Sequence, residues 1–123
     1  MTQKKKDEGT LYIGMDLGTS RTAVASSTGV RESMATCIGY PRDIVAEKLL
    51  NGRKVVYGAE AVELRTSLDF HMPLGKGVIK EGDEEFKAAK DIVRHAIELV
   101  RPRKGEVTYC VIGAPAVASD KNK

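Results

Sequence analysis

The sequence predicts an α/β fold built on a mixed sheet, and three features support that prediction. Short apolar runs joined by tight turns near the N-terminus are typical of antiparallel strands. A long amphipathic segment over residues 84–100 predicts a helix. A nearly continuous apolar run over residues 107–112 then predicts a buried strand. Because a helix between two strands usually makes them parallel, this last strand should lie beside the first one.

The first three strands are expected in direct succession. Residues 11–15 form an apolar run, residues 16–20 form a turn, and residues 22–25 resume a strand of β-branched and small side chains. A third strand is expected over residues 31–38, and residues 39–41 should end the sheet. Strands joined by such short turns pair antiparallel, so the sheet should begin as a three-stranded meander.

Residues 39–77 are expected to form a small inserted subdomain, because this piece is too short to fold alone. Asp43 is placed to cap a short helix that ends at Leu50. A strand over residues 54–57 and a helix over residues 58–70 should follow. The insertion should therefore contain two helices and one strand.

The segment over residues 84–100 is the strongest helix signal in the chain. Asp83 is placed at its N-cap, and acidic residues in the first turn suit the positive end of a helix. Pro102 and Gly105 should end this helix, and Ser119 should cap a further one. Apolar residues at helical spacing predict the face turned to the core: Phe86, Ala89, Val93, Ala96, Ile97 and Val100.

The histidines and cysteines show no pattern typical of a site. His71 is expected in a loop, exposed to solvent and without an acidic partner. His95 falls on the polar face of the long helix and is also expected to be exposed. Cys37 and Cys110 lie in strand-like contexts without metal-ligand spacing, so reduced and buried thiols are expected.

Composition excludes several classes of function. The net charge is +3, from 20 Lys and Arg against 17 Asp and Glu, and part of the excess lies in a flexible basic tail over residues 1–10. No basic stripe or set of stacking aromatics indicates nucleic-acid binding. No apolar run reaches membrane-spanning length, and the N-terminus lacks the apolar core of a signal peptide. A cytoplasmic protein without nucleic-acid partners or membrane insertion is expected.

The turn after the first strand carries the strongest functional signal. Consecutive backbone amides at Gly18, Thr19 and Ser20, with two hydroxyls, could cradle the oxygens of a polyphosphate. Asp16 could hold a Mg²⁺ ion that neutralises those phosphates, through water. The same residue types are common in ordinary hairpin turns. Residue spacing alone therefore supports a phosphate-binding turn and an ordinary hairpin turn about equally.

A family resemblance favours the phosphate-binding interpretation. The motif GMDLGTS over residues 14–20, closely followed by a second strand, resembles the first phosphate motif of the actin-like ATPases. The resemblance implies ATP and Mg²⁺ as cofactors and Asp16 as the metal-linked acid. Gly18, Thr19, Ser20 and Arg21 would then bind the nucleotide, with Arg21 standing where the family pattern has Asn or His.

Further matches, in order along the chain, resemble the bacterial actins that form filaments along magnetosome chains. They imply a ribonuclease-H-like first domain over residues 11–38 and 78–123, incomplete at the C-terminus, with the insertion at residues 39–77. They also imply self-association into filaments and magnetosome-associated proteins as partners. The matching segments are Gly39-Tyr40-Pro41, Leu49-Leu50, Val56-Tyr57-Gly58, Pro73-Leu74, Gly77-Val78 and residues 111–116.

The family's remaining motifs are not found in these residues. The sequence contains neither the catalytic acid nor the second phosphate loop of the family, so no catalytic residue is assigned within the chain. The chain is therefore interpreted as the N-terminal part of an ATP-hydrolysing filament protein. A kinase or chaperone ATPase of the same clan, or a truncated relative that binds or caps filaments, remains an alternative.

Overall fold

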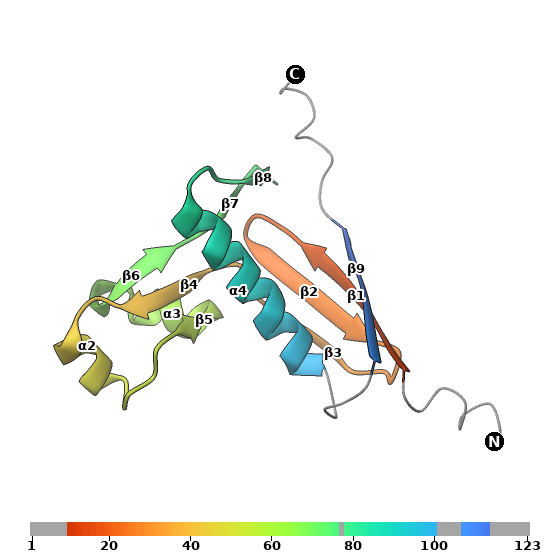
Figure 1. Cartoon of the computed structure of the whole chain (residues 1–123), viewed down its shortest axis with the longest axis horizontal. Coiled ribbons are helices and arrows are strands. Elements are labelled where there is room, and N and C mark those ends of the chain that lie inside the picture. The colour runs from red at the N-terminus through yellow and green to blue at the C-terminus, as the bar shows by residue number, and fades with distance from the viewer. Residues whose placement is uncertain (1–9, 77, 101–106, 114–123) are drawn as a thin grey trace.

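The computed structural model describes residues 10–76, 78–100 and 107–113. Two sheets lie on either side of the long helix α4 (Asp83–Val100), which crosses the middle of the molecule (Figure 1). The larger sheet lies to the right in that view, and the smaller sheet lies to the left. The helix therefore packs against both sheets.

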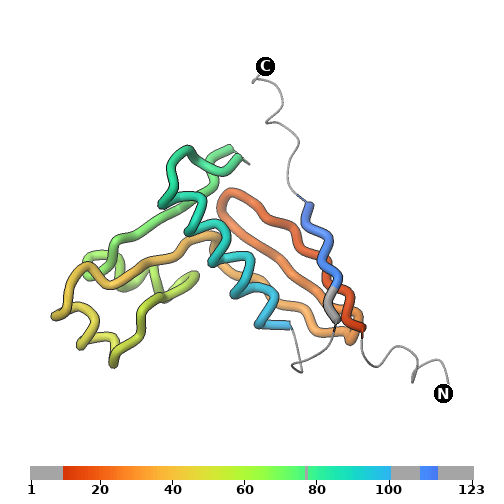
Figure 2. The backbone as a smooth tube through the Cα atoms, in the orientation of Figure 1, coloured from red at the N-terminus to blue at the C-terminus, as the bar shows by residue number. Residues whose placement is uncertain are grey.

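The larger sheet has the strand order β3-β2-β1-β9. Its members are β1 (Thr10–Leu17), β2 (Arg21–Ser26), β3 (Arg31–Ala35) and β9 (Val107–Gly113). β2 pairs antiparallel with both β1 and β3, whereas β9 pairs parallel with β1. Figure 2 shows the first and last described strands side by side. The predicted meander and the predicted parallel return are both confirmed, and the sheet is mixed.

One face of this sheet forms a core with α4. Side chains of β1 alternate between buried and exposed, as a strand with one covered face requires. Three of the four buried side chains pack with the C-terminal half of α4, and the fourth, Leu17, packs nearer the N-terminus of the helix. The cluster at the C-terminal half consists of Leu11, Ile13, Met15, Val24, Ala96 and Val100. Apolar burial therefore sets which face of β1 meets the helix.

The smaller sheet has the order β5-β4-β6, with both pairs antiparallel. It is built from β4 (Ile38–Pro41), β5 (Val56–Tyr57) and β6 (Leu68–His71). A separate two-stranded ribbon joins β7 (Leu74–Gly75) to β8 (Val78–Ile79) just before α4. The ribbon thus spans the expected boundary between the insertion and the main domain.

Two short helices and a 3₁₀ turn complete this part: α2 (Ile44–Leu49), α3 (Gly58–Glu63) and η1 (Arg65–Ser67). Asp43 caps α2 as predicted, because its carboxylate accepts the Ala46 amide at 2.8 Å. The apolar side chains of α2 mostly face outward. Ile44, Val45 and Leu49 are 71%, 68% and 69% exposed.

The strand predicted over residues 31–38 is wrong in its second half. β3 ends at Ala35, and Ile38 begins β4 in the other sheet. The Cys37 amide turns back to the Ala35 carbonyl at 2.9 Å, which breaks the extended run. Residues 39–41, expected to end the sheet, instead belong to β4. Alternating apolar residues on both sides of this bend concealed it in the sequence.

The helix predicted over residues 58–70 is also wrong in its second half. α3 ends at Glu63, and residues from Leu68 onward form β6. Leu68 lies against Gly39 of β4, where an added Cβ would approach the Leu68 Cδ1 atom to 2.5 Å. Pairing with a strand distant in sequence therefore overrides the local helical spacing of Leu64 and Leu68.

The long helix differs slightly from prediction. It begins at Asp83 itself rather than after it, and Phe86 is 53% exposed although it was expected in the core. The buried side chains of the helix are Ala88, Ala89, Ile92, Ala96 and Val100. None of the helices in the described part of the chain is both long and apolar enough to cross a membrane. The features predicted for residues 1–9, 102, 105 and 114–123 lie outside the described residues.

Candidate functional site

The β1–β2 hairpin holds all five residues predicted to form the site. The Gly18 amide donates to the Arg21 carbonyl at 3.1 Å, which closes the hairpin and leaves Thr19 and Ser20 at its tip. A Cβ on Gly18 would lie only 2.6 Å from that carbonyl oxygen, so glycine is sterically required here. The expected cradle therefore needs one correction: the Gly18 amide is occupied within the hairpin.

The hairpin tip is anchored from the neighbouring connection. The Ser20 carbonyl accepts the Thr36 amide at 3.0 Å. Two residues after Ser20, the buried hydroxyl of Thr22 lies 2.7 Å from the hydroxyl of the same Thr36. Because Thr36 lies between β3 and β4, these bonds tie the turn to the connection between the two sheets.

Asp16 lies beside the turn at the carboxyl end of β1. It stands opposite Ala23 of β2 and Gly113 of β9 in the strand register. The carboxylate is exposed, and it forms no hydrogen bond or ion pair with other described residues. The carboxyl ends of two parallel strands meet here, which is the edge where α/β sheets usually bind ligands.

An open hollow of about 740 Å³ covers the face of the larger sheet opposite α4. Asp16 lines it, whereas Gly18, Thr19, Ser20 and Arg21 do not. Arg21 reaches its rim, because its guanidinium donates to the Ser33 hydroxyl at 3.1 Å. The hollow exists because small residues occupy the centre of this face: Gly14, Ala23, Ala25 and Ser33.

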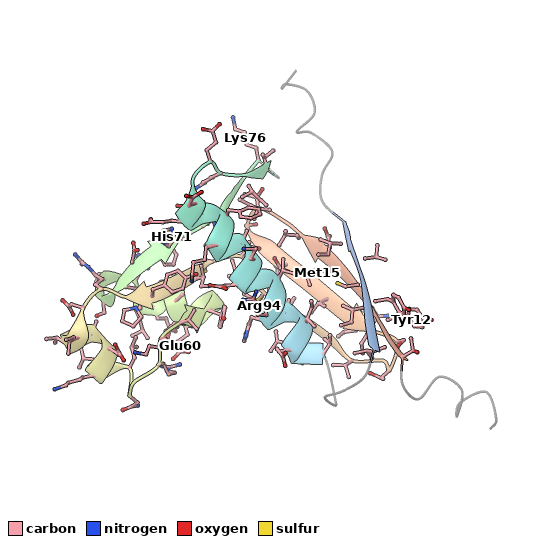
Figure 3. All side chains as sticks on the ribbon, in the orientation of Figure 1. Tyr12, Met15, Glu60, His71, Lys76 and Arg94 are labelled. Atoms are coloured by element: carbon pink, nitrogen blue, oxygen red, sulfur yellow. The ribbon has the colours of Figure 1, made fainter. Side chains whose placement is uncertain are left out.

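Two tyrosines on the same face were not identified from the sequence. Tyr12 of β1 and Tyr109 of β9 stack with ring centroids 5.6 Å apart, and they are 55% and 57% exposed. Figure 3 places Tyr12 on the side of the sheet away from α4. The predicted parallel pairing could have revealed this aromatic contact, because Tyr12 and Tyr109 lie opposite each other in the register of β1 and β9.

His71 differs most from its predicted state. It is the last residue of β6 and only 7% exposed, rather than an exposed loop residue. Its Nδ1 atom lies 2.9 Å from a carboxylate oxygen of Glu85, and its Nε2 atom lies 3.4 Å from Asp69. Burial alone would lower the pKa of His71, but the hydrogen bonds and charges of these two carboxylates outweigh it and raise that pKa.

A second polar contact joins the smaller sheet to α4. The Tyr40 hydroxyl donates to Asp91 at 2.7 Å, and Lys87 and Arg94 also contact that carboxylate. Burial would raise the pKa of Asp91, but these donors and charges lower it. Burial and the Asp91 hydrogen bond raise the pKa of Tyr40. The Asp91 carboxylate is therefore held ionised where the smaller sheet packs on α4.

His95 is likewise not the exposed residue that was predicted. Its ring stacks on Tyr57 of β5, with centroids 3.8 Å apart and planes 4° apart. Burial in this stack lowers the pKa of His95. This contact could not be found in the sequence, because Tyr57 and His95 are far apart along the chain and no local pattern links them.

No family model matches this sequence. A search of curated proteins finds the actin-like protein MamK of Paramagnetospirillum magneticum, which is 42% identical over 114 residues and 92% of this chain. The chain is homologous to MamK. It spans about a third of the length of the curated MamK relatives that it matches, which is 33% for this one.

Solved structures agree with that homology. A MamK double helical filament matches with a TM-score of 0.82 and 41% identity, covering 92% of this chain and 35% of that one. A non-polymerising MamK mutant bound to AMPPNP matches with a TM-score of 0.81 and 41% identity, covering 93% and 35%. The predicted actin-like fold with a mixed sheet is thereby confirmed.

Proposed function

We propose that this chain provides part of an ATP-binding, filament-forming protein of the MamK type. The observation that carries the proposal is the match, at 41% identity, to a MamK filament and to a MamK form that holds a nucleotide analogue. In this proposal ATP binding favours assembly, and hydrolysis by the whole protein makes the filaments dynamic. Assembly would take place in the cytoplasm and would organise magnetosome chains, with magnetosome-associated proteins as further partners.

The β1–β2 hairpin would supply one side of the nucleotide site. Asp16 is suited to hold Mg²⁺ through water, because its carboxylate is exposed and has no other partner among the described residues. Thr19 and Ser20 at the tip would bind phosphate oxygens, while Gly18 keeps the turn tight. Arg21 would add positive charge at the rim of the hollow. The chemistry supplied by Mg²⁺ is neutralisation of the phosphate charge.

The division into parts follows from the same proposal. Residues 11–38 and 78–123 would belong to the first actin-like subdomain, and residues 39–77 would form its small insertion. The insertion exposes apolar side chains on α2, most of all Ile44, Val45 and Leu49. An exposed apolar group of this kind is suited to a contact between copies of the assembled protein.

Replacing Asp16 tests the hairpin assignment. A chimaera in which this chain replaces the matching third of Paramagnetospirillum MamK would be sedimented with and without ATP and Mg²⁺. We expect Asp16→Ala to reduce the ATP-dependent pellet by about tenfold or more, because losing one charge-assisted contact costs about 1.5–3 kcal/mol. Circular dichroism should remain unchanged.

Glu63→Ala is the matched control, because Glu63 is an exposed acid on α3 outside the hairpin. It should sediment like the unaltered chimaera. If Asp16→Ala also pelleted normally with ATP, the metal role of Asp16 would be wrong. If the unaltered chimaera bound ATP but never pelleted, the self-association proposal would be wrong for this chain.

A further inference from the structure

A cluster of potential metal ligands lies where β6 meets the first turn of α4. One ligand atom each from Asp69, His71 and Glu84 lies within 4.8 Å of the other two. Figure 3 shows His71 beside the first turns of α4, away from the β1–β2 hairpin. We propose that these three side chains bind a divalent transition-metal ion of the Zn²⁺ type, separate from the nucleotide site.

The donor set decides the class of metal. An imidazole nitrogen with two carboxylates suits Zn²⁺ and neighbouring transition metals, whereas Mg²⁺ and Ca²⁺ prefer oxygen ligands alone. Zn²⁺ is commonly four-coordinate, so three protein ligands leave one position for water. Asp69 and Glu84 are both exposed, so they can rotate the short distance needed to close around an ion.

His71 is already oriented for such a role. Its Nδ1 atom lies 2.9 Å from the Glu85 carboxylate, so a proton on Nδ1 can be donated to Glu85 while a deprotonated Nε2 serves as the ligand atom. A carboxylate behind the imidazole is the usual arrangement for metal-binding histidines. The Nε2 atom makes only a long hydrogen bond of 3.4 Å with Asp69, and an ion between the two would bind both more closely.

The charge balance also favours a cation. Three carboxylates surround one imidazole, and no lysine or arginine forms an ion pair with any of them in the described part of the chain. The positive end of α4 stabilises Glu84 and Glu85 in part. One oxygen of Glu85, Oε1, is nevertheless enclosed and accepts no hydrogen bond from the described residues. A buried acceptor without a donor is unusual. A divalent ion on the other side of the imidazole would offset the excess negative charge of the three carboxylates.

Metal binding here would have a structural consequence. Asp69 and His71 belong to β6, whereas Glu84 belongs to α4. An ion held by all three would join the smaller sheet directly to the helix that also packs on the larger sheet. The ion would thus stiffen the junction between the insertion and the main domain.

Zinc titration of the untagged full chain tests the proposal. Isothermal calorimetry with a zinc salt should show one ion bound per chain. Glu84→Gln and Asp69→Asn should each raise the dissociation constant for zinc about tenfold or more, which corresponds to a loss of about 1.4 kcal/mol of binding free energy. These exposed positions are chosen because replacing the buried His71 could also unfold the chain. Glu63→Gln, an exposed acid on α3, should bind zinc as the unaltered chain does.

A second measurement identifies the imidazole. Zinc should shift the His71 ring signals in nuclear magnetic resonance spectra and leave those of His95, which stacks on Tyr57, unchanged. The proposal is overturned if zinc does not bind up to about 1 mM. It is equally overturned if Glu84→Gln and Asp69→Asn bind zinc as tightly as the unaltered chain, because the ion would then lie elsewhere.

Discussion

The two ends of α4 pack against different sheets by different means. Near its C-terminus, Ala96 and Val100 lie against the apolar side chains of β1, including Leu11 and Ile13. Nearer its N-terminus, the same helix faces the smaller sheet and adds polar contacts to an apolar cluster around Ile92. Those polar contacts are His71 with Glu85 and Tyr40 with Asp91. Tyr57 of the smaller sheet also stacks on His95, in the C-terminal half of the helix.

The difference shows what each kind of packing demands of the sequence. Apolar burial is non-directional and roughly proportional to area, so it needs only the right spacing of apolar residues. A buried polar contact needs a specific partner at hydrogen-bond distance, and it depends on the protonation of that partner. We call the contact between α4 and the larger sheet the apolar seam, and the contact between α4 and the smaller sheet the polar seam. The stability of the apolar seam should respond most to lost side-chain volume, and that of the polar seam to the loss of single atoms and to pH.

The largest effect is expected from removing volume in the apolar seam. Leu11 is fully buried, so Leu11→Ala should lower the free energy of unfolding by about 2–5 kcal/mol. Urea unfolding followed by circular dichroism measures this. Leu49→Ala is the matched control, because Leu49 is 69% exposed and its loss should change stability by only about 0.5 kcal/mol. Equal effects of the two substitutions would contradict the assigned core.

A smaller effect is expected from removing one oxygen in the polar seam. Tyr40→Phe deletes the hydroxyl that donates to Asp91 at 2.7 Å. Because Lys87 and Arg94 still contact that carboxylate, we expect a loss of about 1–2 kcal/mol, measured by the same unfolding experiment. Tyr12→Phe removes an equivalent hydroxyl from a half-exposed ring and should be nearly neutral. A neutral Tyr40→Phe would show that the Asp91 contact does not stabilise the seam.

The smallest effect should come from the protonation of His95. Burial lowers its pKa in the folded chain, so the unfolded chain binds the proton more readily. The neutral ring contributes full stability above the unfolded pKa of about 6.5, and this contribution is lost as pH falls through the lowered folded value. His95→Gln should therefore reduce the loss of stability between about pH 7.5 and 5.5. An unchanged pH dependence in that variant would contradict the role of the Tyr57 stack.

Prediction from the sequence succeeded where one periodic pattern was enough. The existence of β1, the hairpin that leads to β2 and the parallel return of β9 were all found from local residues, whereas the exposed face of β1 was not. Prediction failed at residues 64–71, where helical spacing was overridden by pairing of β6 with β4. It failed again at His71 and His95, because Glu85 and Tyr57 are brought to them only by the fold.

For this chain, the sequence by itself determined the mixed sheet, the amphipathic helix and the hairpin that holds Asp16 and Gly18. These depend on strand alternation, helical periodicity and the steric demand of a tight turn, which act over a few neighbouring residues. Only the tertiary structure decided the second sheet and the carboxylates around His71. The reason is that hydrogen bonds and charges act over a few ångströms in space, whatever the separation of their residues along the chain.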